Sequence, residues 1–240
     1  MWVLRQHQAG APFSVDAAYE AAARPYLNRA WKDSKSGLWK ANPKRHICLR
    51  EHYYGDWNEE TEKAQVPAMI AQVRQCTSVF IESVLPRLAH VRREQEVPVA
   101  IIGSGGDPES FMWNGVKVYA IPDYVYRDGN RFCIHDWKSG KPRKRHHDQL
   151  NLYGLWAVEK HKVAPSDVTV FIEYLSDGSV DTRTLSNDDI EGVRGLIGES
   201  VGEMAEYLED GDVARNEPMP QEVWDLAPDR RPCRFCNFFE

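Results

Sequence analysis

Three ionisable side chains near the middle of the chain have the types and spacing of a metal-dependent hydrolytic site. Asp123 is followed thirteen residues later by Asp136, and Lys138 comes two residues after that. In an extended strand, Asp136 and Lys138 would point to the same face. Carboxylate oxygens suit Mg²⁺ or Mn²⁺, which can activate a water and neutralise charge on a phosphate. The lysine could orient that water or stabilise the developing charge.

A predicted β-hairpin would bring these side chains together. The Asp-Gly pair at 128–129 is a strong turn signal between two apolar strands. If this pair forms a two-residue turn, Asp123 lies opposite Ile134, on the same face as Asp136. A one-residue bulge would destroy that register. The alternative is a solvated, inert Asp–Lys pair, which the apolar flanks disfavour, because charges in an interior hairpin need compensation.

The elements expected around the hairpin alternate between helices and strands. Helices are predicted at 14–31, 60–90, 148–161 and 187–208, and strands at 97–102, 116–126, 132–137, 168–175 and 182–185. We expect Pro25 to end or kink the first helix and Pro67 to lie in the first turn of the second. The order predicts an α/β (α+β) fold with a small mixed central sheet flanked by helices. The expected parts are an N-terminal segment at 1–59, a core at 60–210 and a tail at 211–240.

Length and composition suit a protein with one large core. The 240 residues are 42% hydrophobic and 28% charged, and no apolar run is long enough for a membrane span. We expect a cytoplasmic protein, since the N-terminus lacks a signal peptide. The net charge of −6 does not by itself indicate a nucleic-acid partner. Five cysteines, an odd number, indicate reduced thiols rather than a disulfide framework.

The motif around the hairpin resembles that of a known enzyme family. Pro122-Asp123 followed by Asp136-Trp-Lys138-Ser-Gly is similar to the motif of PD-(D/E)XK nucleases, in particular their RecB-like exonuclease branch. Gln149 and Tyr153 resemble the Gln-x-x-x-Tyr helix of that branch and would share one helical face. The resemblance implies a restriction-endonuclease-like core that hydrolyses DNA with Mg²⁺ or Mn²⁺. Asp123 and Asp136 would hold the metal, Lys138 would position the nucleophile, and Gln149 and Tyr153 would support it.

A basic loop is expected directly after the lysine. Residues 138–147 contain five Lys or Arg, which could grip DNA phosphates without reading sequence. A solvated loop without function is the alternative. His146 and His147 are expected to belong to this basic surface rather than to bind metal. The DNA-binding candidates are Lys141, Arg143, Lys144 and Arg145.

Three cysteines match an additional metal centre. In the CRISPR-associated RecB-like nucleases and the AddB-type nucleases, one cysteine before the core and three after it hold an iron–sulfur cluster, and Cys48, Cys233 and Cys236 resemble three of these four. A cysteine that matches the fourth position does not occur in the sequence. The alternatives are an exchangeable [4Fe–4S] cluster, zinc with His46 or His52 as fourth ligand, or free thiols. Separately from these, Cys76 and Cys133 are expected to be buried apolar residues.

One feature departs from the family pattern. Members of the branch usually supply a further metal ligand, a His or Glu, from the helix before the sheet. The helix at 60–90 has no histidine before its last residue, which leaves as candidates Glu62, Gln65, Gln72, Gln75 and Glu82. Two other functions stay open: a structure-selective endonuclease that acts on flaps or overhangs, and a catalytically idle DNA-binding module of the same fold.

Overall fold

The structure is a computed structural model that describes residues 1–42, 45–53, 58–101, 106–143 and 145–224. The chain divides into two compact units. The first contains Met1–His90 and Leu175–Gly178, and the second contains Val91–Tyr174 and the described residues from Ser179 onward. The parts expected from the sequence at 1–59, 60–210 and 211–240 stay a prediction.

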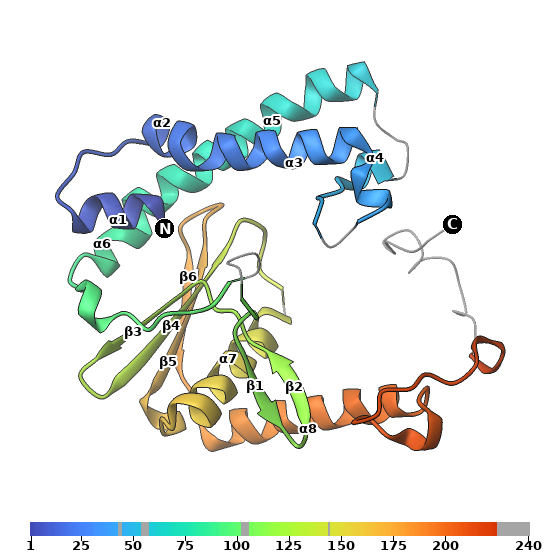
Figure 1. Cartoon of the computed structure of the whole chain (residues 1–240). Helices are drawn as coiled ribbons and strands as arrows, with labels where there is room; N and C mark the ends of the chain where they lie inside the picture. The colour runs from blue at the N-terminus through green and yellow to red at the C-terminus, as the bar shows by residue number, and fades with distance from the viewer. Residues whose placement is uncertain (43–44, 54–57, 102–105, 144, 225–240) are drawn as a thin grey trace. The chain divides into compact units, whose positions relative to one another are not determined.

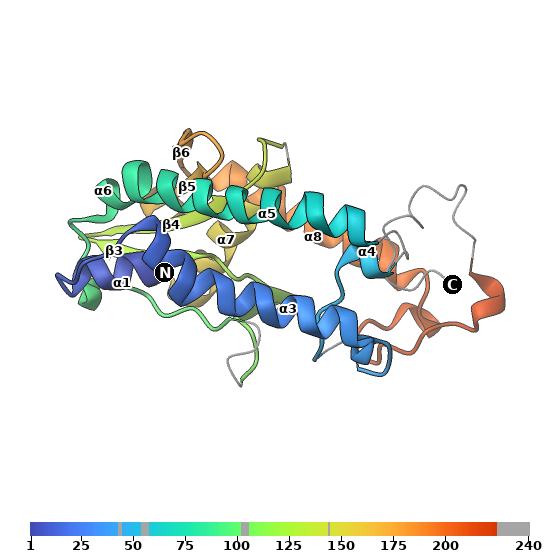
Figure 2. The same cartoon turned by 90° about the horizontal axis from the view of Figure 1, so that it is seen from above.

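The first unit is helical. Its helices are α1 (Trp2–Gln8), α2 (Val15–Ala18), α3 (Arg24–Ser36), α4 (Arg50–Tyr53), α5 (Glu59–Val79) and α6 (Leu85–Leu88), with π-helical turns at Tyr19–Ala23 and Phe80–Val84. Figure 2 shows α3 and α5 next to each other. They run antiparallel: Lys35 near the end of α3 is 3.2 Å from Glu62 near the start of α5, and Asp16 in α2 is 2.5 Å from Arg74 later in α5.

The helix does not end at Pro25, and the prediction that Pro67 lies in a first turn was wrong. Ser14 caps α2 as expected, accepting from the Ala17 N–H at 3.1 Å, but the helical segment continues past Pro25 to Ser36. The π-helical turn before Pro25 lets the Arg24 N–H bond to the Tyr19 carbonyl, five residues back. This wider turn accommodates the proline ring, which a regular α-helix would crowd. Pro67 lies inside α5, whose remaining turns offset its one missing hydrogen bond.

The second unit contains the sheet. Its strands are β1 (Ser110–Trp113), β2 (Val116–Tyr119), β3 (Tyr124–Asp128), β4 (Arg131–Lys138), β5 (Val168–Tyr174) and β6 (Val180–Thr184), and its helices are α7 (Arg145–His161) and α8 (Asn187–Ala205). The main sheet has the order β3-β4-β5-β6, and α7 connects the parallel pair β4 and β5 (Figure 1). The other two pairs are antiparallel. The predicted α/β fold with a small mixed sheet is confirmed.

The strand predictions before β3 were wrong in two respects. Residues 97–101 form no strand; Glu96 makes a single bridge to Tyr126. The expected strand at 116–126 is broken into β2 and β3, because Pro122 has no N–H for a ladder hydrogen bond. The separate β1–β2 hairpin was missed, although its turn, Asn114-Gly115, is a strong hairpin signal and has positive φ at both residues.

The core of this unit lies between α7 and one face of the sheet. Phe132 and Ile134 in β4 and Val170 and Ile172 in β5 are fully buried, and Trp156 of α7 packs in the same cluster. Burial of such side chains stabilises the fold by roughly 2 kcal/mol each. Because Asp136 follows Ile134 in the alternation of β4, the packing of α7 fixes the face on which Asp136 lies. No described helix is both long and apolar enough to cross a membrane.

Candidate active site

The hairpin of β3 and β4 places Asp123 opposite Asp136. Asp128 pairs with Arg131, so the two-residue turn is Gly129-Asn130, with Gly129 at a φ of 60°. Tyr124 pairs with His135, and Asp123, directly before β3, therefore falls opposite Asp136. The predicted pairing of Asp123 with Ile134 was wrong by two positions. Since side chains alternate with a period of two, the two carboxylates still share one face.

The three side chains of the motif are in different environments. Asp136 is 3% exposed, Lys138 is half-buried, and Asp123 is open to solvent. Lys138 Nζ lies 2.7 Å from Asp136 Oδ2. Asp123 Oδ2 accepts a hydrogen bond from the main-chain N–H of Trp137 at 2.7 Å. A solvent-accessible carboxylate therefore stands beside a buried one and its lysine.

The surroundings of Asp123 disfavour its negative charge. Although the side chain reaches solvent, the protein around it removes part of its hydration, and this is the largest cause that raises the pKa of Asp123. The charge of Asp136 raises that pKa further. The Trp137 N–H and the Lys138 ammonium lower it, without cancelling the shift. A bound cation would offset this repulsion.

A hydrogen-bonded chain leads from Lys138 into α7. Lys138 Nζ donates to Gln149 Oε1 at 2.6 Å, and Gln149 Nε2 donates to the Tyr153 hydroxyl at 2.7 Å. That hydroxyl in turn donates to the Ile121 carbonyl at 3.1 Å. Tyr153 is buried, and burial is the main cause that raises its pKa, so the hydroxyl stays protonated as a donor. The structure thus brings together the five residues Asp123, Asp136, Lys138, Gln149 and Tyr153.

The carboxylate pair fits a divalent cation. Asp136 Oδ2 is buried and makes no hydrogen bond of regular geometry in the described chain, so a lone pair remains for a ligand. The described residues contain no group of three or more His, Cys, Asp or Glu side chains that could hold a metal. Two carboxylates are nevertheless enough for Mg²⁺ or Mn²⁺, which complete their coordination with waters and substrate phosphates. When bound, the cation would activate a water and neutralise phosphate charge.

Comparison with protein families identifies this arrangement. The family model of the PD-(D/E)XK nuclease superfamily matches residues 19–240. The chain belongs to the PD-(D/E)XK nuclease superfamily. Neither the curated proteins nor the solved structures gave a match. Membership of the PD-(D/E)XK superfamily supports a nuclease-type function, and the mixed α/β fold is consistent with its restriction-endonuclease-like core.

The basic segment differs from the expected loop. Lys141 and Arg143 are exposed, as predicted, and Lys144 lies outside the described residues. Arg145 begins α7 rather than extending a loop. The prediction that His146 belongs to the basic surface was wrong, because its ring is buried, with Nδ1 3.2 Å from the Tyr174 hydroxyl. Burial is the largest cause that lowers the pKa of His146, followed by the charge of Lys138.

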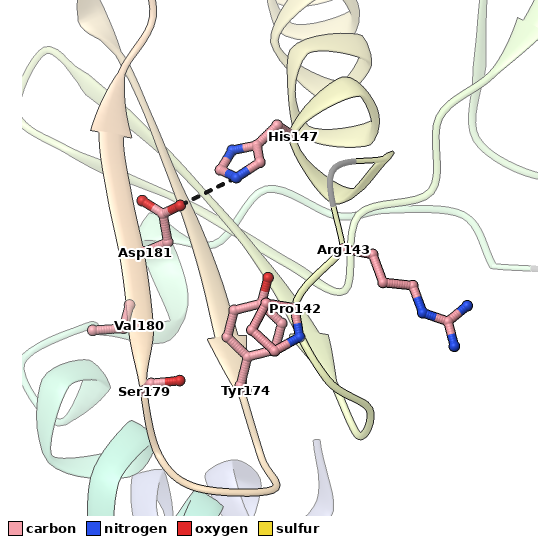
Figure 3. Close-up of a pocket in the computed structure, with 7 residues that line it drawn as sticks. All are labelled: Pro142, Arg143, His147, Tyr174, Ser179, Val180 and Asp181. Carbon is pink, nitrogen blue, oxygen red and sulfur yellow. Dashed lines mark ion pairs between the residues drawn. The ribbon is translucent and has the colours of Figure 1, made fainter.

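An open pocket of about 370 Å³ lies beside this segment (Figure 3). It is lined by Pro142, Arg143, His147, Tyr174, Ser179, Val180 and Asp181. Tyr174 pairs in register with Lys138, so the pocket adjoins the end of the motif strand. His147 Nε2 is 3.4 Å from Asp181 Oδ2, whereas the Arg143 guanidinium points away from the other lining side chains. Arg143 is thus presented outward from the rim.

The predicted cysteine site can be followed only at Cys48. Its thiol is half-buried, burial raises its pKa, and it donates to the Leu49 carbonyl at 3.4 Å. His46 Nδ1 is 3.5 Å from Asp33 Oδ1, and His52 Nδ1 contacts the Ser34 hydroxyl. Cys233 and Cys236 lie outside the described residues. Cys133 is buried, as expected, whereas Cys76 is only half-buried.

Five residues of the helix expected at 60–90 were candidates for an additional metal ligand. Glu62 is ion-paired with Lys35, and Glu82 accepts a hydrogen bond from the Ser78 hydroxyl at 2.6 Å. The side chains of Gln65, Gln72 and Gln75 are exposed. Which of them contributes to the site stays a prediction.

Sequence reasoning missed two features around the carboxylates. One is the main-chain N–H of Trp137, which orients Asp123 and leaves no trace in side-chain types. The other is Glu173, which is fully buried in β5 and accepts from the Trp137 indole at 2.7 Å. A single acidic residue within the apolar run Val-Thr-Val-Phe-Ile-Glu-Tyr was the available signal.

Proposed function

We propose that this chain is a Mg²⁺- or Mn²⁺-dependent deoxyribonuclease of the RecB-like branch that degrades DNA as an exonuclease. The observation that carries the proposal is the environment of Lys138. Its ammonium is held between Asp136 and Gln149, at 2.7 and 2.6 Å, on the face that also holds Asp123. A solvated surface pair would not need a buried carboxylate or a hydrogen-bonded chain from α7.

Each side chain has a role in phosphodiester hydrolysis that follows from its environment. Asp123 and Asp136 would hold the cation, which neutralises charge on the scissile phosphate. Lys138 donates a hydrogen bond to the attacking water or to a phosphate oxygen as charge develops. Gln149 and Tyr153 fix the ammonium of Lys138, so that little reorganisation is needed in the transition state.

The basic segment supports a phosphate backbone as the ligand. Lys141 and Arg143 are exposed beside the motif strand, and Arg145 is exposed at the start of α7. Such contacts give affinity without sequence specificity, which suits an exonuclease. With Lys144, they form the proposed DNA-binding set. The outward direction of Arg143 at the pocket rim is consistent with a DNA strand that passes over this surface.

We also propose a structural metal centre that includes Cys48, Cys233 and Cys236, as an iron–sulfur cluster or a zinc site. Support comes from the spacing of Cys233 and Cys236 and from the half-buried thiol of Cys48. Metal analysis of anaerobically purified protein tests this proposal. Iron with visible absorption that is lost on Cys233→Ala identifies a cluster, zinc without colour identifies the alternative, and the absence of both metals refutes the centre.

End-labelled linear DNA provides the test of the nuclease proposal. The protein should degrade it with Mg²⁺ or Mn²⁺, stop with EDTA, and lose activity on Asp136→Asn. A matched control is Asp167→Asn, an acidic residue at the end of the short 3-10 helix Pro165–Asp167 before β5, which should cleave as wild type does. If wild-type protein binds DNA but cleaves none with either metal, the chain is the idle module instead.

Closed circular DNA separates the two modes of cleavage. An exonuclease leaves a closed circle intact while it degrades the linear form from its ends. Cleavage of a circle that carries a single-stranded flap, at the flap junction, would overturn the exonuclease proposal in favour of the structure-selective endonuclease.

A further inference from the structure

A buried polar cluster lies on the face of the sheet opposite the carboxylates. In β4, His135 and Trp137 alternate with Asp136 and therefore point to the other face. There, Glu173 Oε2 accepts from Trp137 Nε1 at 2.7 Å and lies 3.0 Å from His135 Nδ1. Glu173 and His135 are 0% and 2% exposed. A carboxyl group at this depth is costly unless donors satisfy it, and the side chains of Trp137 and His135 surround it here.

The cluster is connected to the candidate active site through one residue. The indole of Trp137 is held by Glu173, its partner in the ladder between β4 and β5, and stacks on Tyr124 with 6.1 Å between ring centroids. The main-chain N–H of the same residue donates to Asp123 Oδ2 at 2.7 Å. Any rotation or slip of the Trp137 main chain would therefore move the Asp123 carboxylate.

Asp123 depends on this hydrogen bond more than Asp136 depends on any single contact. Asp136 is enclosed, with the Lys138 ammonium 2.7 Å away. Asp123 precedes β3 and its side chain reaches solvent, so the hydrogen bond from the Trp137 N–H contributes more to the position of its carboxylate. A carboxylate that must meet a cation within a few tenths of an ångström requires such support from its neighbours.

We propose that Glu173 is a positioning residue that sets the Asp123 carboxylate for metal binding by holding Trp137. The inference rests on the proposed function, because it assigns Glu173 to the same cation site. A purely structural role for Glu173 is the competing explanation. In that case its removal would lower stability and leave the intrinsic metal affinity of the folded protein unchanged.

The test compares variants of the two linked residues with a matched control. Trp137→Phe keeps an aromatic ring and the main-chain N–H but removes the indole N–H donor. Glu173→Met removes the acceptor, and Glu173→Gln restores one accepting oxygen. Tyr126→Phe is the control, because it removes a buried hydroxyl that is hydrogen-bonded to Cys133, keeps the ring that stacks on His135, and leaves the indole of Trp137 and the carboxyl group of Glu173 unchanged.

Two readouts do not depend on turnover. The first is the dissociation constant for Mn²⁺, measured by calorimetry on the full chain without DNA. The second is hydrogen exchange of the main-chain amide at position 137, followed by NMR in metal-free protein. Thermal melting in EDTA records the stability lost in each variant, so that metal affinity is compared at a temperature where all are folded.

We expect Trp137→Phe and Glu173→Met to weaken Mn²⁺ binding by about tenfold, as the loss of a supporting partner commonly does. The amide at position 137 should exchange faster in both. Glu173→Gln and Tyr126→Phe should bind Mn²⁺ within about twofold of wild type, because each leaves the link from acceptor to indole in place. If Glu173→Met does not fold, the Mn²⁺ affinity of Trp137→Phe compared with that of Tyr126→Phe decides the question.

Two failures are distinguishable. If wild type binds Mn²⁺ and cleaves DNA but Trp137→Phe binds Mn²⁺ equally well, Glu173 is structural and the inference is overturned alone. If wild type neither binds Mn²⁺ nor cleaves DNA, the proposed function fails and the inference fails with it.

Discussion

Tyr153→Phe should test what the hydrogen-bonded chain from Lys138 to Tyr153 contributes to cleavage without changing the two carboxylates of the metal site. The hydroxyl that this change removes accepts from Gln149 at 2.7 Å and donates to the Ile121 carbonyl at 3.1 Å. Two hydrogen bonds are lost, and both former partners are left beside a buried ring. Such losses cost about 2 kcal/mol, which corresponds to a fall of about 4–8 °C in Tm for a chain of this length.

The effect on cleavage follows from the freedom that Gln149 gains. Without its hydroxyl partner, the amide that holds the Lys138 ammonium can rotate, and Lys138 spends less time in place. We expect the single-turnover cleavage rate at saturating Mg²⁺ to fall about tenfold, as for other supporting partners. DNA affinity should not change, because the tyrosine is buried and the exposed basic residues are left in place.

The assay needs a control with a similar cost in stability. Tyr126→Phe also removes one buried tyrosine hydroxyl from this unit, but its partner is Cys133 on the other face of the hairpin. It should lower Tm and leave the cleavage rate unchanged. If Tyr153→Phe cleaves at the wild-type rate despite its lower Tm, the chain from Tyr153 through Gln149 does not position Lys138, and that reasoning is wrong.

Three further changes test the electrostatics of the site. Asp123→Asn should raise Tm in EDTA at neutral pH and abolish the additional rise in Tm on adding Mn²⁺. The reason is that a carboxyl group whose folded-state pKa is raised contributes stability at low pH, and this stability is lost as pH rises through that pKa. A lower Tm in EDTA would contradict this. For the same reason, cleavage by wild type at subsaturating Mg²⁺, where protons compete with the cation for Asp123, should begin to decline, as pH is lowered, at a pH above the usual range of aspartate, and a decline only within that range would contradict the raised pKa. Arg143→Ala should weaken DNA binding and reduce the slope of log affinity against log salt by about one, as measured by fluorescence anisotropy in a salt series, whereas an unchanged slope would exclude a phosphate contact.

The geometry of the motif could be predicted because it depends on alternation. Asp128-Gly129 and Gly129-Asn130 are both acceptable turns, so the sequence alone could not distinguish two registers that differ by two positions. A shift of two leaves every side chain on its face. The convergence of Asp123 with Asp136 was therefore secure although the predicted pairing was wrong.

Features that depend on distant contacts could not be predicted in this way. His146 follows a run of basic residues, and its burial depends on Tyr174 in a strand that follows α7. The role of Glu173 depends on the parallel pairing of β5 with β4, which brings residues 36 apart in sequence into contact. The continuation of the helix through Pro25 depends on a π-helical turn that no propensity indicates.

The central claim is that Asp123, Asp136 and Lys138 form one phosphodiesterase site, and Lys138→Met tests it most directly. Methionine keeps much of the apolar stem but removes the ammonium that stands between Asp136 and Gln149. Single-turnover cleavage of labelled linear DNA should fall by about a hundredfold or more, with DNA binding retained, as for the loss of a group that stabilises transition-state charge. A variant that cleaves within about twofold of wild type would contradict the account.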